Sequence, residues 1–250
     1  MKRIFISIII SLVITNYLEM FELPYAIKIR NLIYYGSLTD RENGEVKYTF
    51  SNGEKLFNPV SLAQEVLPQS QCLLSTYYIT LPLLNCKEIK INHRDIMNSA
   101  NNILKHLKYK TYKDLNFAML PYDFYLPIYD LKAPWYSGMA QGHAIEVLLA
   151  AYNHSKEDKF KNNAILIGNS FKVNVSNGGV KVNLSKGLWY EEYASNKKTK
   201  HPLVLNGHNF ALDALFWLKQ EDSSFEYYFN EGLLAVKENV ETYYSLSWTY

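Results

Sequence analysis

The sequence has few of the residues and motifs that mark several common classes of protein. It contains two cysteines in 250 residues, no Cys-x-x-Cys pair, and no His/Cys cluster with the spacing of metal ligands. It also has no P-loop, dinucleotide-binding fingerprint or Gly-x-Ser-x-Gly motif. A disulfide between Cys72 and Cys86 stays open, since an oxidising compartment would allow it but nothing in the sequence requires it.

An excess of charge of either sign is also missing. The formal net charge is +2, so overall electrostatics predict no nucleic-acid partner. What the chain does have is 21 tyrosines. Tyrosine combines a flat apolar face with a hydroxyl group, and carbohydrate clefts use that combination. Composition alone favours a second explanation, a compositional bias of the source, because Asn, Lys and Ile are abundant as well.

A hydrophobic run begins the chain. Lys2 and Arg3 precede an apolar stretch from Ile4 to Ile14, as in the first two regions of a signal peptide. The run is short for a membrane span, and no clear cleavage site follows it. We therefore expect residues 1–21 to be an uncleaved anchor or a poor signal peptide, in a membrane-anchored or secretory, Golgi-lumen type of protein. The alternative is a cytoplasmic protein that begins with a helix or strand.

Residues 22–56 have the pattern of a short β-hairpin region. The turn dipeptides Asn43-Gly44 and Asn52-Gly53 flank the stretch EVKYTF. From residue 57 to residue 250 a helical period dominates, and we take this range as one domain. The predicted helices cover residues 58–67, 93–107, 137–152, 157–171, 206–218 and 224–240.

Two further segments of that domain are predicted to be non-helical. Residues 111–135 are rich in proline and aromatics, and we expect them to be extended because proline biases its predecessor away from helix. Residues 171–185 (FKVNVSNGGVKVNLS) predict a β-hairpin that turns at Asn177-Gly178-Gly179. The expected fold is mainly α: an incomplete α/α-hairpin toroid or barrel with a small N-terminal β portion and one inserted β-hairpin.

Three predicted helices begin with an amide side chain beside a glycine or proline. The three stretches are Phe57-Asn58-Pro59, Gln141-Gly142-His143 and Asn206-Gly207-His208. In an α/α toroid the inner helices start at the rim of the cleft, where a small residue lets a substrate approach and an amide can bind it. Ordinary helix capping explains any one of them, but the three together favour a cleft.

The stretch WYEEY holds two adjacent glutamates. In an extended segment Glu191 and Glu192 point to opposite faces, so they cannot form an acid/base dyad of the glycosidase type. Glu191 would then be a solvated or salt-bridged carboxylate.

A basic run follows at Lys197, Lys198, Lys200 and His201. It is either a solvated loop or an overhang that attracts an anionic substrate.

Four stretches resemble the C-terminal domain of the D-glucuronyl C5-epimerases, which act on heparosan- or heparan-type glycans. They are PWYSGMAQG at 134–142, WYEEY at 189–193, VLNG at 204–207 and FNPVSLAQ at 57–64. The resemblance covers roughly residues 55–250. PWYSGMAQG is long and unusual, which makes the resemblance fairly specific.

The resemblance implies an α/α-type barrel and an isomerase that converts D-glucuronate into L-iduronate at C5. It implies that Glu192 and Tyr193 match catalytic positions and that Asn206 matches an asparagine of the substrate cleft. Tyr136 and Gln141 are cleft candidates by motif position. The basic run, with Lys197 and Lys198, would bind the anionic uronate-containing polysaccharide. The reaction needs no metal or organic cofactor, and a homodimer stays open.

The sequence departs from the family at its end. The family continues with a Tyr-Asp-Leu-Arg-His motif and a Trp-Asp-Tyr-His motif, which supply a further catalytic tyrosine, a carboxylate-binding arginine and another tyrosine. This sequence reaches Tyr250 before either motif. We therefore expect a fragment or a degenerate protein, and no C5 exchange by these 250 residues alone. The alternatives are a polysaccharide lyase or hydrolase on an α/α toroid, and a non-catalytic glycan-binding remnant.

Overall fold

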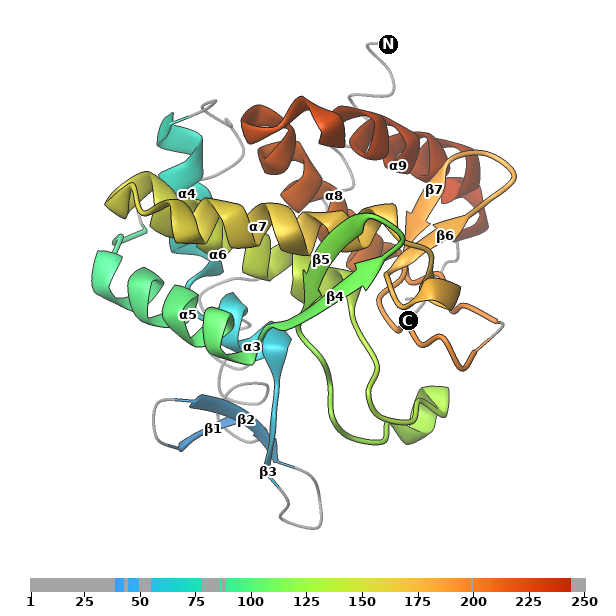
Figure 1. Ribbon diagram of the computed structural model, residues 1–250, viewed down its shortest axis with the longest axis horizontal. Helices are drawn as coiled ribbons and strands as arrows, with labels where there is room; N and C mark the ends of the chain where they lie inside the picture. The colour runs from blue at the N-terminus through green and yellow to red at the C-terminus, as the bar shows by residue number, and fades with distance from the viewer. Residues whose placement is uncertain are drawn as a thin grey trace. The chain divides into compact units, whose positions relative to one another are not determined.

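The computed structural model describes residues 39–42, 45–49, 55–77, 86, 89–198 and 200–243. The chain divides into two compact units, Met1–Asn58 and Pro59–Tyr250, which are described here one at a time (Figure 1). The predicted signal or anchor at residues 1–21 lies outside the described residues. No helix in the described part of the chain combines the length and the apolar character that crossing a membrane would require.

The first unit contains a three-stranded antiparallel sheet in the order β1-β2-β3. Its strands are β1 (Thr39–Glu42), β2 (Glu45–Thr49) and β3 (Lys55–Phe57). The register pairs Glu42 with Glu45, so a two-residue link joins β1 to β2 where the sequence has Asn-Gly. The predicted hairpin is therefore confirmed, and β3 adds a third strand to it.

The second unit is mainly helical, as predicted. Its α-helices are α3 (Pro59–Gln64), α4 (Leu67–Tyr77), α5 (His93–His106), α6 (Gly138–Ser155), α7 (Asp158–Asn169), α8 (Leu205–Glu221) and α9 (Glu226–Asn239). Its strands form two antiparallel hairpins, β4 (Lys108–Tyr112) with β5 (Leu115–Met119) and β6 (Lys181–Asn183) with β7 (Leu188–Tyr190). Short 3-10 helices are η2 (Pro127–Tyr129), η3 (Ser170–Lys172), η4 (Val175–Asn177), η5 (Ser223–Phe225) and η6 (Val240–Tyr243).

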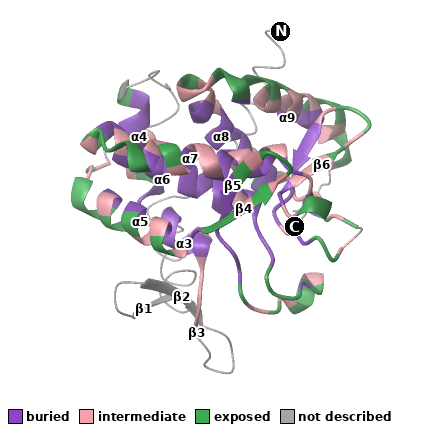
Figure 2. Cartoon of the chain, viewed as in Figure 1, coloured by how far each residue is buried: buried purple, intermediate pink, exposed green. Residues whose placement is uncertain are grey.

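Helix α6 is the centre of this unit. It packs against α3, α4, α5, α7 and α8, and almost all of its side chains are buried (Figure 2). The Ser137 hydroxyl caps its first turn by accepting a 3.2 Å hydrogen bond from the Ala140 N–H. Gly142 lets α8 approach closely, because a Cβ there would lie 2.6 Å from the Phe210 carbonyl oxygen. The sequence predicted this helix at residues 137–152, and other helices pack around it.

The helices predicted from Asn58, Glu157, Asn206 and Ser224 are also confirmed, as is α5. Short links join α6 to α7 and α8 to α9, and each pair packs together. The first predicted helix ends early at Gln64, and α4 follows it as a separate helix that the sequence analysis did not predict. A disulfide joins Cys72 of α4 to Cys86, the pairing that the sequence allowed but did not require. The closure of these helices into a toroid stays a prediction.

The hairpin predicted at Asn177-Gly178-Gly179 is wrong in position. The Asn174 carbonyl accepts hydrogen bonds from the N–H groups of Asn177 and Gly179, and this winds the segment into the short helix η4 instead of a strand. The valines that suggested alternation, Val173, Val175 and Val180, are all buried. The actual hairpin, β6–β7, lies further along the chain and turns between Asn183 and Leu188.

The prediction of an extended segment at residues 111–135 holds only in part. β5 lies within it, but β5 pairs with β4 in a hairpin that the sequence analysis missed. Lys113 provides the turn with a positive φ of 52°. Beyond β5 the chain is irregular and includes η2. A run of charged and aromatic residues such as KYKTYKDLNF hides the period of two that a half-buried strand normally displays.

Candidate active site

The candidate site is built on the segment that follows β7. Strand β7 is fully buried, and the chain leaves it at Glu191 (Figure 2). The Glu191 backbone is held at both ends: its N–H donates to the Val180 carbonyl at 2.8 Å, and its carbonyl accepts from the Gly138 N–H at 2.8 Å. This fixes where the next two side chains, Glu192 and Tyr193, are presented.

Glu191 itself closes the loop that carries the basic run. Its side chain is fully buried, and its two carboxylate oxygens accept hydrogen bonds from the N–H groups of Tyr193 and Leu203, both at 3.1 Å. Burial raises the pKa of Glu191, while these backbone hydrogen bonds and the nearby His201 lower it. The expectation of a solvated or salt-bridged carboxylate is therefore wrong. The Glu191 carboxylate instead binds the backbone at Tyr193 and at Leu203, the two ends of the loop.

Glu192 lies against the first turn of α8. A Cβ added at Gly207 would fall 2.4 Å from the Glu192 Oε2 atom, so only glycine leaves room for this carboxyl group. Burial is the main reason that the pKa of Glu192 rises from 4.5 to about 7. The charge of Glu191 adds to the rise, and the Tyr193 hydroxyl and the Gly207 N–H oppose it. Glu192 can therefore take up or release a proton near neutral pH.

Tyr193 is the hydrogen-bonding partner of Glu192 and is half-buried. Its ring stacks on Tyr129 with centroids 4.1 Å apart and lies 5.9 Å from the ring of Trp135, which stacks in turn on Tyr122 at 3.9 Å. The Tyr129 hydroxyl also forms a side-chain hydrogen bond with Tyr193. Burial and the charge of Glu192 raise the pKa of Tyr193 above its ordinary value, so the side chain is a neutral phenol that can donate its proton.

The tyrosine pair faces a groove with a positive side. We call it the cationic groove; its volume is about 260 Å³, and its lining residues are Tyr129, Leu131, Tyr193, Lys198, Lys200, His201 and Pro202. Lys198 reaches across to Asp130 and forms an ion pair at 2.7 Å. Lys198 holds the pKa of Asp130 below its usual range. Since Asp130 is exposed, the ion pair itself contributes little stability.

The structure brings some of the predicted site residues together and separates others. Tyr193 and Lys198 line the cationic groove, and Glu192 is hydrogen-bonded to Tyr193 without lining the groove itself. Tyr136 and Lys197 line a second pocket. Asn206 is exposed in the first turn of α8, next to the Gly207 that contacts Glu192.

Gln141 is a correction to the predicted cleft. It is fully buried, and its amide group is bonded to backbone: Oε1 accepts from the Leu120 N–H at 2.9 Å, and Nε2 donates to the carbonyls of Leu120 and Ser137. This side chain ties β5 to the start of α6 and does not reach a substrate. Gln141 precedes a glycine, and for that reason it was compared with the residues that begin helices. It lies inside α6, which begins at Gly138 and is capped by Ser137.

The two histidines beside those helix starts are structural as well. The Nδ1 atom of His208 accepts a hydrogen bond from the Tyr190 N–H at 2.9 Å, so Nε2 carries the proton toward the Gly232 carbonyl at 3.1 Å. Burial lowers the pKa of His208 to about 4 and that of His143 to about 3. Both side chains are therefore neutral parts of the interior.

Sequence reasoning missed the aromatic half of the site. Tyr129, Trp135 and Tyr122 come from the irregular segment after β5, which was predicted only as extended chain. The density of aromatics around the four-residue stretch PIYD and the stretch PWY was the available signal. It could not show which rings meet, because that depends on the turn at η2 and on the bridge between Tyr122 and Trp135.

Fold and site together define a mainly helical protein in which a buried carboxyl group pairs with a half-buried phenol at the edge of a cationic groove. Comparison with known proteins makes this more specific. The model of the family described as D-glucuronyl C5-epimerase C-terminus matches residues 113–250, more than half of the chain. The chain belongs to the D-glucuronyl C5-epimerase family, as the sequence resemblance predicted.

Two curated relatives match parts of the chain. The D-glucuronyl C5-epimerase of Caenorhabditis elegans is 41% identical over 112 residues, which cover 45% of this chain and 16% of that protein. An uncharacterised protein of Methanocaldococcus jannaschii is 31% identical over 147 residues, which cover 55% of this chain and 46% of that protein. The matches therefore span less than half the length of either relative.

Among the described residues, no group of three or more His, Cys, Asp or Glu side chains is arranged to hold a metal ion.

Proposed function

We propose that these residues form part of an active site that inverts C5 of D-glucuronate to give L-iduronate in a heparosan-type polysaccharide. The observation that carries the proposal is the pair formed by Glu192 and Tyr193 at the cationic groove, in a chain of this family. One member of the pair titrates near neutral pH and the other is a phenol that faces the groove.

The chemistry explains why a cationic groove is needed. The C5 hydrogen of a uronate lies next to a carboxylate, so its removal places further negative charge on a group that is already anionic. Positive groups aimed at that carboxylate stabilise the enolate-like state. Lys198 and Lys200 lie on the wall of the groove and supply this role in our proposal.

Glu192 and Tyr193 transfer the proton together. The raised pKa of Tyr193 makes a free phenolate unfavourable, so the phenol cannot simply be a resting base. As the Tyr193 oxygen takes the proton from C5, the phenolic proton passes to Glu192, and the C–H electron pair moves into the enolate. The reverse transfer lets Tyr193 protonate C5 and recover its own proton from Glu192.

Inversion requires a second proton donor on the opposite face of the sugar. The family's Tyr-Asp-Leu-Arg-His motif is our candidate for that donor. The resemblance implies that the same motif supplies a carboxylate-binding arginine, a further positive group for the enolate-like state. Because removal of the C5 proton would lack that group, we expect these 250 residues to bind heparosan oligosaccharides without exchanging the C5 proton. We expect exchange by a full-length protein that joins these residues to the motif.

Deuterium incorporation at C5 tests the proposal. Heparosan oligosaccharides are incubated in D₂O with the full-length gene product, and loss of the C5 proton signal is followed by NMR. We expect exchange together with appearance of iduronate. Absorbance from an unsaturated uronate would instead indicate a lyase, which shares the first proton transfer. Binding of the oligosaccharide with no exchange would leave a glycan-binding protein and remove the epimerase proposal.

A further inference from the structure

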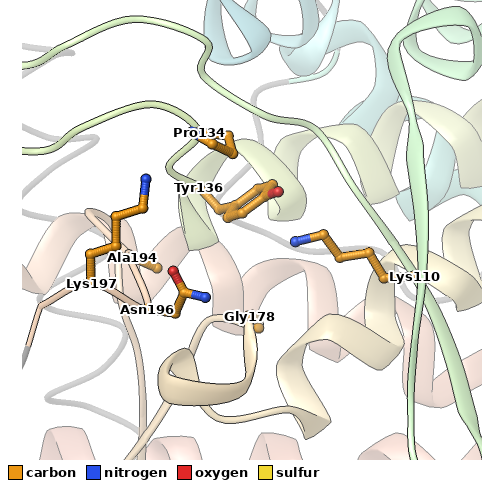
Figure 3. Close-up of a pocket in the computed structure, with 8 residues that line it drawn as sticks. Lys110, Pro134, Tyr136, Gly178, Ala194, Asn196 and Lys197 are labelled. Carbon is orange, nitrogen blue, oxygen red and sulfur yellow. The ribbon is translucent and has the colours of Figure 1, made fainter.

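A second pocket opens beside the cationic groove. We call it the Tyr136 pocket; its volume is about 200 Å³, and its lining residues are Lys110, Pro134, Tyr136, Gly178, Gly179, Ala194, Asn196 and Lys197. Figure 3 shows Lys110 and Lys197 on opposite sides of the Tyr136 ring, with Asn196 and Gly178 below it. The lining comes from β4, from the segment before α6, from the turn after η4 and from the loop after β7, so four parts of the chain build this pocket.

The chemistry of the lining favours an anion with hydroxyl groups. The Lys110 ammonium lies 4.1 Å from the centre of the Tyr136 ring, so its charge is held over the pocket. Lys197 approaches from the other side, where its ammonium donates to the Ala133 carbonyl at 3.1 Å. None of the eight lining residues is acidic. The exposed amide of Asn196 adds a donor and an acceptor of the kind that bind sugar hydroxyls.

The shape of the pocket also leaves room for a ligand next to that charge. Gly178 adopts a positive φ of 87°, and a Cβ on it would meet only one neighbour, the Lys110 ammonium at 3.6 Å. The space in front of Lys110 is therefore open because no side chain grows from this position. The Tyr136 ring provides one flat wall of the kind on which a sugar ring packs.

The pocket is fixed in place relative to the cationic groove. Ala194 and Tyr136 exchange two backbone hydrogen bonds of 2.8 and 2.9 Å. Tyr193, directly before Ala194, lines the groove, and Lys197 and Lys198 line the pocket and the groove respectively. The segment from Tyr193 to Lys198 is thus a shared wall between two cationic sites.

We propose that the Tyr136 pocket binds a second acidic sugar of the same polysaccharide whose uronate occupies the cationic groove. The inference rests on the proposed function, because it takes the polymer from there. A chain with repeated carboxylates can place one in each site, so a long oligosaccharide gains a contact that a disaccharide lacks. The second site positions the polymer and takes no part in the proton transfer.

Binding measured by calorimetry tests this with a heparosan decasaccharide and a heparosan disaccharide. We expect Lys110→Gln to weaken decasaccharide binding about tenfold, the size of one lost charge-assisted hydrogen bond, and to leave disaccharide binding unchanged. Lys110→Arg keeps the charge and should bind nearly as well as the unaltered protein. Lys237→Gln, an exposed site on α9 with the same change of charge, is the matched control and should have no effect.

The outcomes separate this inference from the proposed function. Equal decasaccharide binding by Lys110→Gln and Lys237→Gln would overturn the Tyr136 pocket, even in a protein that exchanges the C5 proton. A Lys110-dependent gain for the decasaccharide without C5 exchange in the full-length gene product would keep the pocket as an acidic-glycan site and remove the epimerase. In an exchanging protein we expect Lys110→Gln to raise KM and leave kcat unchanged.

Discussion

Two places in the helical unit hold a buried acid whose pKa lies above its ordinary value. One is Glu192, beside the cationic groove, whose pKa rises to about 7. The other is Glu146 on α6, whose pKa is raised by burial and by the charge of Asp213 on the adjoining helix α8. In both places burial is the largest cause of the shift, and a neighbouring carboxyl group adds to it at Glu192 and at Glu146.

The two places differ in what surrounds the acid. Glu192 has a phenol as partner, and that phenol lines a groove with lysines on its wall. Glu146 is fully buried between packed helices, where the side chains of Gln71 and Trp217 partly offset the rise of its pKa. A shifted pKa is therefore common to an active-site candidate and to a helix interface, and only the path to a substrate distinguishes them.

Replacing the Tyr193 phenol should reduce C5 exchange more than any other change predicted here. We expect Tyr193→Phe to reduce C5 exchange by the full-length gene product by about 10²- to 10⁴-fold, because it removes the group that faces C5. Decasaccharide binding should remain within a few-fold of normal, since the ring still stacks on Tyr129. Exchange rates and calorimetry on the same preparation check this. Near-normal exchange would exclude Tyr193 from proton transfer.

The pH dependence of the rate separates the two acids. We expect the exchange rate to rise as pH increases through about 7, because Glu192 must be ionised to accept the phenolic proton. Glu192→Gln should lower the rate by about 10²-fold and abolish that rise. Glu146→Gln should keep both the rate and the pH profile. A profile that moves in Glu146→Gln and not in Glu192→Gln would reverse the assignment.

Stability should respond to Glu192 with a defined sign. Its pKa is higher in the folded chain than its ordinary 4.5, so the folded state binds more protons between pH 4.5 and about 7, and stability falls across that range. Above pH 7 the cost is about 3 kcal/mol, from about 1.4 kcal/mol per pKa unit. Glu192→Gln should therefore be more stable than the unaltered chain at pH 8 and about equal to it at pH 4.

Denaturant unfolding at the two pH values measures this difference. Glu146→Gln is the comparison variant, because burial raises the pKa of Glu146 and so favours its neutral form, which the amide matches in size and charge. Its free energy of unfolding at pH 7 should change by less than about 1 kcal/mol. A Glu192→Gln chain that loses stability at pH 8 would mean that the carboxylate is stabilised where it lies.

A smaller effect is expected at Gly207. A Cβ there would overlap the Glu192 side chain, so Gly207→Ala must displace the carboxyl group or shift the start of α8. We expect a loss of about 1–3 kcal/mol in stability, as for other overpacking changes, and a fall in exchange without loss of decasaccharide binding. Thermal unfolding and exchange assays measure the two effects. Unaltered exchange would show that the position of Glu192 tolerates displacement.

Much of the helical framework could be predicted from the sequence. Ser137 and Asn92 cap helices where the apolar period begins, and these local signals act within a few residues. The hairpin at residues 171–185 was misplaced because the same valines satisfy either a strand or a compact turn. The hydrogen bonds to the Asn174 carbonyl decide between them, and they depend on the packing around Gly179.

The residues of the candidate site could also be predicted from the sequence only in part. Glu192 and Tyr193 could be named from WYEEY and the family resemblance, and Lys198 from the basic run. The roles of Gln141 and Glu191 could not, because both depend on backbone groups distant in the sequence, at Leu120 and Leu203. The separation of Lys197 and Lys198 into two pockets also follows from the folded loop and not from their adjacency.

Deuterium incorporation at C5 by three forms of the full-length gene product tests the central contrast most directly. The forms are the unaltered protein, Glu192→Gln and Glu146→Gln, assayed at pH 8 on one heparosan oligosaccharide. We predict equal exchange by the unaltered protein and Glu146→Gln, and about 10²-fold slower exchange by Glu192→Gln. Equal exchange by all three forms would contradict the account, because Glu192 would then be a buried acid of the same kind as Glu146.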